Sequence, residues 1–139
     1  MGALPSSARA LLNSGALAHV STINADGSPH VTVVWIETQG DEVVFFARAD
    51  RVKMKNLRRD ARIVISVQDT TAAASGLMQY LTLRGTARIR DGQPIDDLMD
   101  RLARRYLGRD RFPFPRDGQT AVHVAVERLG GNGPWTAGE

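Results

Sequence analysis

A short basic segment, residues 50–60, holds the side chains whose types and spacing are best suited to chemistry. It reads as a helix with Asp50 as its N-cap, which places Arg51 and Lys53 in the first turn. Cations in that turn oppose the helix macrodipole at a cost of about 0.3–1 kcal/mol each. A bound anion would reverse the balance, because free backbone N–H groups and two cations would converge on one phosphate. A solvated basic helix explains the same residues, and the segment by itself favours neither interpretation.

Other arrangements that support catalysis or metal binding are missing from the sequence. The three histidines, His19, His30 and His123, are far apart and lack the spacing of a metalloprotease helix. No nucleophile elbow and no P-loop is present, and there is no cysteine to supply a thiolate or a disulfide. We therefore expect no protein nucleophile and no metal site. His30 is the histidine to test, because it lies on the second predicted strand.

Length and composition are those of one globular domain covering residues 1–139, with 42% hydrophobic residues. The net charge of +3 and the pI of about 9.9 invite a nucleic-acid interpretation. Acidic residues are interspersed almost everywhere, however, and neither an RNP-type aromatic strand nor a zinc-finger spacing occurs, so we expect no nucleic-acid partner. No apolar run reaches membrane-spanning length and the N-terminus lacks signal-peptide features, which predicts a cytoplasmic protein without a membrane partner.

Hydrophobic alternation and turn residues predict six strands and two or three short helices. The strands are expected at residues 16–24, 29–37, 43–48, 61–68, 77–90 and 120–129, and the helices at residues 6–15, 50–60 and 94–107. The Ala25-Asp26-Gly27-Ser28 cluster is a hairpin signal, and Gly85 indicates a bulge in the fifth strand. Six strands in hairpin order favour a mainly β, α+β fold: a small antiparallel barrel with helices covering its ends.

Three stretches of this pattern resemble the split β-barrel of the pyridoxamine 5′-phosphate oxidase-like, flavin- and deazaflavin-dependent oxidoreductases. Residues 17–31 resemble the opening hairpin of that family. Residues 51–62 resemble its phosphate-binding segment and are the most specific of the three. Residues 83–87 resemble its fifth strand, which ends in a Gly-x-Ala pattern. The resemblance implies a six-stranded antiparallel split β-barrel of the FMN-binding type.

Within the family, the branch that uses the deazaflavin coenzyme F-420 is the most similar. The similarity rests on Arg51, Lys53, Asn56 and Leu57 and on the Arg-Asp-x-Arg ending of the same segment. True pyridoxamine phosphate oxidases are longer and carry a substrate-phosphate site near the C-terminus, whereas the tail from Gly130 onward has no such basic motif. The resemblance thus implies F-420, with FMN as the alternative, and argues against oxidation of a vitamin B6 phosphate.

The resemblance also implies which residues bind the cofactor. Those implied to hold its phosphate are Arg51 and Lys53, with weaker candidates Lys55, Asn56, Arg58 and Arg59. Those implied to flank its tricyclic ring are Thr32, Val33, Val34 and Trp35, of which only some can point at the ring because side chains alternate along a strand. The family binds its cofactor between two subunits, which implies a homodimer in which the partner chain contributes Gln79 and Tyr80.

Two classes of function follow from these expectations. An oxidoreductase would transfer a hydride between the cofactor and a small organic substrate, unsaturated or conjugated, while the protein binds, orients and excludes water. A non-catalytic module would instead store or sense flavin, heme or a related pigment, and heme would require His19, His30 or His123 as an axial ligand. Substrate contacts are expected from the loops at residues 69–76 and 109–118, whose sequences do not identify the substrate.

Overall fold

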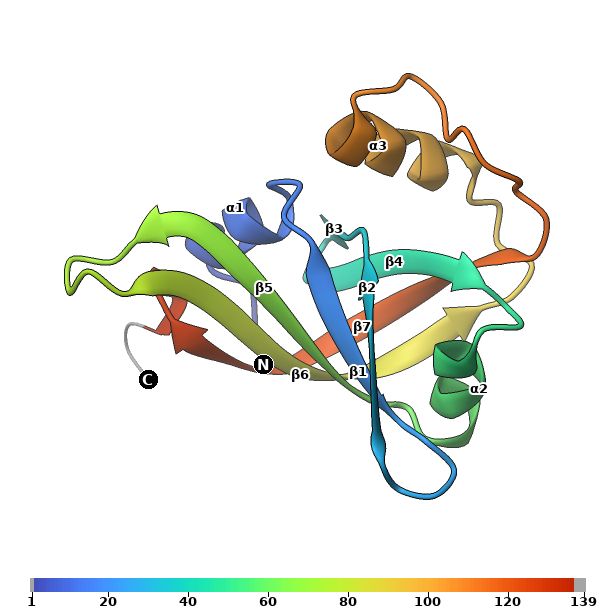
Figure 1. The fold of residues 1–139 in the computed structure, drawn as a ribbon, viewed down its shortest axis with the longest axis horizontal. Helices are drawn as coiled ribbons and strands as arrows, with labels where there is room; N and C mark the ends of the chain where they lie inside the picture. The colour runs from blue at the N-terminus through green and yellow to red at the C-terminus, as the bar shows by residue number, and fades with distance from the viewer. Residues whose placement is uncertain (1, 137–139) are drawn as a thin grey trace.

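The computed structural model describes residues 2–136, which form one antiparallel sheet with helices packed around it (Figure 1). The strands are β1 (Ala18–Ile23), β2 (Pro29–Val34), β3 (Glu37–Gln39), β4 (Glu42–Arg48), β5 (Arg62–Ala72), β6 (Met78–Arg90) and β7 (Gln119–Asn132). They are hydrogen-bonded in the order β2-β1-β5-β6-β7-β4-β3. Most neighbours in the sheet are also consecutive in the chain, as hairpin connections require.

The sheet has seven strands, so the expected number of six is wrong, and the reason lies in the predicted strand at residues 29–37. β2 ends at Val34, and Glu37–Gln39 forms β3, which pairs with β4 at the other edge of the sheet. Between the two strands, the backbone N–H of Ile36 donates to the hydroxyl of Tyr106 at 3.1 Å. The Tyr106 hydroxyl thus takes the place of the neighbouring strand with which the sequence pattern predicted this N–H to pair. No ladder within residues 2–136 joins β2 to β3, and closure into a barrel stays a prediction.

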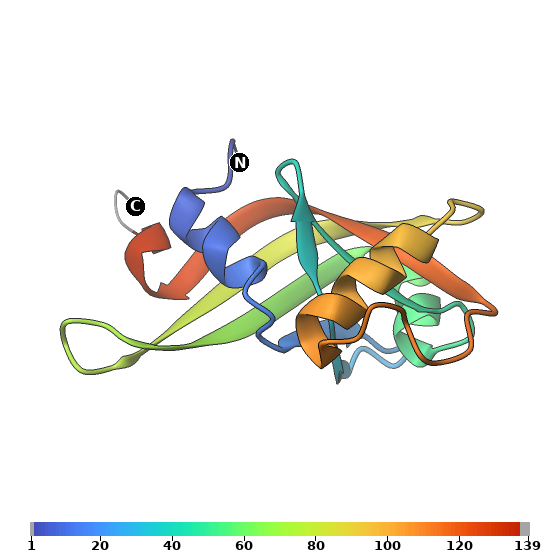
Figure 2. The same cartoon turned by 90° about the horizontal axis from the view of Figure 1, so that it is seen from above.

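Three α-helices pack on the sheet. α1 (Ser6–Leu12) contacts β3, β5 and the 3-10 turn η1 (Pro134–Thr136). α3 (Asp96–Leu107) packs on β4 and β7, and the view in Figure 2 shows it crossing above them. α2 (Val52–Arg59) follows β4 and contacts β1 and β6. None of the helices in residues 2–136 has both the length and the hydrophobicity that crossing a membrane demands.

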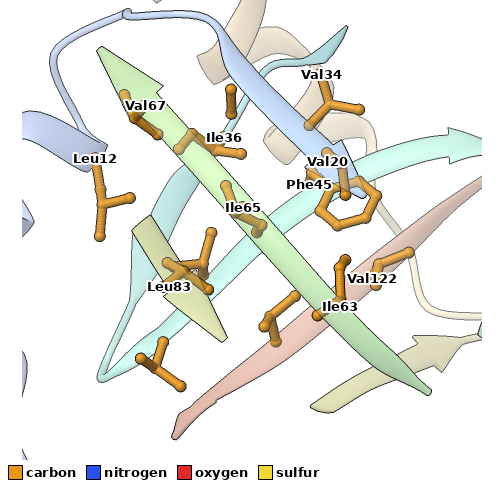
Figure 3. Close-up of a cluster of buried hydrophobic side chains, with 14 of the residues drawn as sticks. Leu12, Val20, Val34, Ile36, Phe45, Ile63, Ile65, Val67, Leu83 and Val122 are labelled. Atoms are coloured by element: carbon orange, nitrogen blue, oxygen red, sulfur yellow. The ribbon is translucent and has the colours of Figure 1, made fainter. Parts of the chain in front are cut away.

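The main hydrophobic core lies between the inward faces of the strands. Figure 3 shows Val20, Phe45, Ile63, Ile65 and Leu83 converging from four different strands. Each of these side chains is 2% exposed or less. Full burial of one such side chain is worth about 1.5–3 kcal/mol, so the core holds β2, β4 and α2 in fixed relative positions around the site described below.

The bulge expected at Gly85 is confirmed. The register between β6 and β7 shifts between Arg84 and Gly85. A Cβ atom added at Gly85 would lie 2.3 Å from the carbonyl oxygen of Ala125. Only glycine therefore allows the two backbones to approach this closely.

Candidate functional site

The start of α2 differs from the predicted one. Its N-cap is Arg51, without a side-chain cap bond, so the prediction of Asp50 as N-cap is wrong. The carboxylate of Asp50 instead accepts hydrogen bonds from the guanidinium of Arg48, at 3.3 and 3.2 Å. The charged partner on the preceding strand holds Asp50 away from the helix, and Lys53 keeps its expected place in the first turn.

A cleft of about 280 Å³ opens where the end of β2, β4, the start of α2 and the segment before β7 meet. The residues of the lining that were predicted from sequence are Val33, Val34, Trp35, Arg51 and Lys53. The structure adds Phe46, Ala47, Arg48, Phe112, Phe114 and Gln119. The lining thus combines the basic side chains of Arg48, Arg51 and Lys53 with the aromatic ones of Trp35, Phe46, Phe112 and Phe114.

The basic residues of the cleft include two cations without an ion-pair partner in the described part of the chain. Arg48 is paired with Asp50, whereas neither Arg51 nor Lys53 forms an ion pair with any residue between 2 and 136. The carbonyl of Arg51 accepts the N–H groups of Met54 and Lys55 at 3.0 and 3.2 Å. The N–H groups of the helix's first turn before Met54 remain available to an anion.

Lys53 shows the electrostatic cost of this arrangement. Burial, and after it the positive charge of Arg51, lower the pKa of the Lys53 ammonium below the ordinary lysine value. Both effects disfavour the charged form in the absence of a counter-ion. An anion placed between Lys53 and Arg51 would counteract both, so the pair is better suited to binding a ligand than to stabilising the fold.

The aromatic residues of the cleft lining belong to one connected group of rings. Trp35 stacks on Tyr106, with ring centroids 5.4 Å apart and an interplanar angle of 11°. Trp35 also meets Phe46 and Phe112 edge to face, at 6.2 and 6.1 Å. Phe112 contacts Phe46 and Phe114, each at 5.4 Å. Pairs of this kind contribute about 0.5–1.5 kcal/mol beyond burial, and together they make a firm apolar wall.

Tyr106 fixes this aromatic group to the backbone. Its hydroxyl accepts the N–H of Ile36 and donates to the carbonyl of Ala16 at 2.8 Å. Burial raises the pKa of Tyr106, so the hydroxyl keeps its proton and remains a donor. The helix that carries it is held by Arg101, which donates to Glu37 at 3.1 and 3.0 Å.

Thr32, Lys55 and Asn56 do not line the cleft, and neither do the weaker candidates Arg58 and Arg59. Asn56 is 3% exposed, and its amide donates to Thr22 at 3.0 Å and Asn24 at 2.9 Å, which ties α2 to the β1–β2 hairpin. Lys55 is exposed on α2. The hydroxyl of Thr32 is buried and has no hydrogen-bond partner in the described part of the chain. Asn56 thus has a structural role rather than a place on the cleft surface.

Gln79 and Tyr80 lie on β6, close to the tip of the β5–β6 hairpin, which projects from one end of the sheet in Figure 1. Tyr80 is 44% exposed. Neither residue lines the cleft of its own chain. A role for them in the site requires a second chain, and it stays a prediction.

Sequence reasoning missed most of the aromatic half of the cleft. Phe46 looked like an ordinary strand residue, and Arg48 like the end of the same strand. Phe112 and Phe114 fall in the loop expected to contact substrate, but were not singled out. Their Phe-Pro-Phe-Pro pattern was a usable signal, because proline restricts the backbone and can hold an exposed ring in place.

The cleft lining contains no histidine. His19 is exposed on β1, and His30 is partly buried on β2. His123 is 7% exposed, and its Nδ1 lies 3.5 Å from a carboxylate oxygen of Glu42. Burial lowers the pKa of His123, and the charge of Glu42 partly opposes that shift. Within residues 2–136, no three His, Asp or Glu side chains gather as a metal site would need.

Solved structures of other proteins share this fold. The chain is similar to an F-420 reductase, with a TM-score of 0.73 and 24% identity over 88% of this chain and 94% of that one. It is similar to a putative pyridoxamine 5′-phosphate oxidase from Listeria innocua, with a TM-score of 0.65 and 11% identity over 88% and 92%. A heme binding protein from Mycobacterium smegmatis gives a TM-score of 0.67 and 19% identity over 90% and 53%. No curated protein matches by sequence, and similarities at these identities establish the fold alone.

A family match extends over nearly the whole chain. The sequence model described as pyridoxamine 5′-phosphate oxidase matches residues 4–132. That range contains all seven strands, the three α-helices and every residue of the cleft lining. The chain therefore belongs to the pyridoxamine 5′-phosphate oxidase family.

Proposed function

We propose that the protein is an oxidoreductase that binds coenzyme F-420, or alternatively FMN, in this cleft and transfers a hydride to or from a small organic substrate. The observation that carries the proposal is the meeting of Arg51 and Lys53 with the aromatic group around Trp35 in a single cleft. Both cofactors join a phosphate to a flat tricyclic ring, and the cleft offers a suitable surface to each part. The similarity to an F-420 reductase favours the deazaflavin.

The residues present fit such a cofactor. Arg51 and Lys53 would hold the phosphate together with the first N–H groups of α2. Val33 and Trp35 would flank the ring and shield it from water, whereas the side chain of Val34, although it borders the cleft, is buried in the main core. When bound, the cofactor supplies the hydride chemistry, while the protein supplies binding, orientation and exclusion of water. This division of labour accounts for a site without a protein nucleophile.

The size of the cleft supports a site shared between two chains. Ligand pockets commonly measure about 300–1,000 Å³, and this cleft of about 280 Å³ falls just below that range. A tricyclic cofactor with its side chain would need a further wall. A homodimer would provide it if the hairpin of the second chain brought Gln79 and Tyr80 over the cleft.

We propose that the two chains meet on an exposed face of the sheet. Val31, Val33 and Val64 on β2 and β5 are 59%, 47% and 42% exposed, which is unusual for a patch of valines on a monomer. Two hollows of about 410 and 490 Å³ adjoin this face, and Val64 and Arg84 line both. A two-fold axis through such a patch would bury it against its own copy.

The alternative function is a non-catalytic module that stores or senses flavin, heme or a related pigment. A structural neighbour is described as a heme binding protein. None of the three histidines lines the cleft, however, so this cleft offers no imidazole ligand to a heme iron. The basic and aromatic lining is better matched to a phosphorylated flavin or deazaflavin.

The test has two steps. Fluorescence titration with F-420 and with FMN measures binding. Reduced cofactor is then mixed with a panel of conjugated compounds, and return of the oxidised cofactor's absorbance measures turnover. We expect binding in the micromolar range or tighter for one cofactor, and reoxidation of the reduced cofactor by at least one compound. Binding without reoxidation would favour storage, and absence of binding for both cofactors would refute the proposal.

A further inference from the structure

The segment between α3 and β7, residues 108–118, contains neither helix nor strand and contributes Phe112 and Phe114 to the wall of the cleft. Its centre reads Phe112-Pro113-Phe114-Pro115. Each proline fixes its own φ at about −65° and confines the residue before it to an extended conformation. Four successive residues therefore have little freedom left to lose when a ligand binds, and the wall is preorganised.

Arg116 anchors this wall to α3. Its guanidinium donates to the carboxylate of Asp96 at 2.8 Å and also to that of Asp100. Asp100 accepts, in addition, the backbone N–H of Phe112 at 2.9 Å. The pKa of Asp100 is lowered, first by the N–H of Phe112 and then by Arg116, so the carboxylate stays charged at neutral pH. One carboxylate thus joins the beginning of the Phe-Pro-Phe-Pro run to the arginine that ends it.

The far end of the segment is tied to the basic side of the cleft. The carbonyl of Gly118 accepts the backbone N–H of Ala49 at 2.8 Å. Ala49 lies between Arg48 and Asp50, two residues before the N-cap of α2. The spacing between the aromatic wall and the cations is therefore set by this backbone hydrogen bond together with the contacts of Asp100 to Phe112 and Arg116.

Phe114 is the exposed part of this aromatic wall. It is 57% exposed although it lines the cleft, and its ring meets Phe112 at an interplanar angle of 75°. An aromatic ring that is exposed, yet held by two prolines and an edge-to-face contact, presents a fixed apolar surface to the cleft. A ligand with a flat ring can use such a surface, whereas a puckered saturated ring fits it less closely.

We propose that Arg116 is a positioning residue that holds Phe112 and Phe114 as a fixed wall, through which the cleft selects substrates with a flat conjugated ring. The inference rests on the proposed function and specifies the class of its substrate. In the assembled site, the cofactor phosphate occupies Arg51 and Lys53, and the substrate ring lies against Phe114. Arg116 itself touches Asp96 and Asp100 and does not line the cleft.

The test compares two probes that carry the same anion on a flat or a puckered ring: naphthalene-2-sulfonate and decahydronaphthalene-2-sulfonate. Binding of each to the full chain without cofactor is measured by isothermal titration calorimetry. Stacking of an aromatic pair corresponds to a preference of roughly threefold to tenfold for the flat probe. We expect this preference in the wild type, and a ratio within about twofold of unity in Arg116→Ala. Arg116→Lys, which can reach one carboxylate at a time, should give an intermediate ratio.

Tryptophan emission supplies a second readout that needs no ligand. Trp35 lies in the cleft 6.1 Å from Phe112, whereas the other tryptophan, Trp135, is only 4% exposed. Iodide quenching should therefore report on Trp35 and increase in Arg116→Ala as the wall loosens. The matched control is Arg88→Ala, which removes a comparable two-bond ion pair with Glu42 outside the cleft and should leave quenching and probe ratio unchanged.

Phe114→Leu keeps the experiment decisive even if Arg116→Ala does not fold, because it changes an exposed ring and leaves the anchor intact. It should abolish the preference for the flat probe while the affinity for inorganic phosphate stays within twofold. A wild type without preference, or a Phe114→Leu or Arg116→Ala variant that keeps it, would overturn the inference. Failure of wild type to bind F-420 and FMN would refute the proposed function instead, since the probe ratio is measured without either cofactor.

Discussion

Replacing Arg51 or Lys53 by alanine tests the assignment of the basic side of the cleft. Each side chain is expected to form one charge-assisted hydrogen bond with the cofactor phosphate, worth roughly 1.5–3 kcal/mol. At 1.4 kcal/mol per tenfold change, loss of one bond should weaken binding by about tenfold to a hundredfold. The double variant should bind almost nothing. Fluorescence titration of F-420 and FMN into each variant measures the effect.

The stability of the free protein should not decrease in these variants. Neither Arg51 nor Lys53 has an ion-pair partner in residues 2–136, and burial and, after it, the charge of Arg51 lower the pKa of Lys53. Removal of either cation should therefore leave the free energy of unfolding unchanged or slightly higher, as measured by urea denaturation. A binding defect without a stability defect would separate a ligand site from a structural one.

Arg58→Ala is the matched control on the same helix. Its guanidinium donates to Asp91 at 3.0 and 2.8 Å, away from the cleft. Loss of this exposed pair should cost about 0–1 kcal/mol of stability and leave the cofactor affinity within about twofold of wild type. Equal affinities for wild type, Arg51→Ala and Lys53→Ala would refute the reasoning and leave α2 as a solvated basic helix.

Three further predictions concern pH, histidines and assembly. In the free protein the pKa of Lys53 is lowered, and a bound anion should raise it. The affinity for the cofactor should therefore be highest below the free-protein pKa and fall as pH rises through the bound-state pKa. Lys53→Ala, titrated across the alkaline range, should not show this pH dependence. The stability of the free protein should change with pH in the opposite direction. Because the folded-state pKa of Lys53 lies below the ordinary lysine value, the free energy of unfolding should increase as pH rises toward that value. Alanine at His19, His30 or His123 should leave most turnover intact, and a loss of several orders of magnitude for His30→Ala alone would reveal a missed protein acid. Sedimentation at micromolar concentration should give a two-fold homodimer, and a monomer there would count against a site shared between chains.

The sequence determined the elements that local chemistry controls. Period-two alternation located the strands, the Ala-Asp-Gly-Ser cluster located the first hairpin, and the bulge at Gly85 followed from the absence of a side chain. Local charge spacing also singled out Arg51 and Lys53, and both line the cleft. These signals are readable because each depends on residues that are neighbours in the chain.

Tertiary structure alone decided the rest. The break after Val34 depends on the hydroxyl of Tyr106, a residue 70 positions from its donor Ile36, so alternation could not reveal it. The aromatic half of the site joins β2, β4, α3 and the segment before β7, which are distant in sequence and meet only when α3 packs on the sheet. The cleft therefore exists only in the packed chain, because burial and hydrogen bonding between residues remote in sequence determine which side chains face one another.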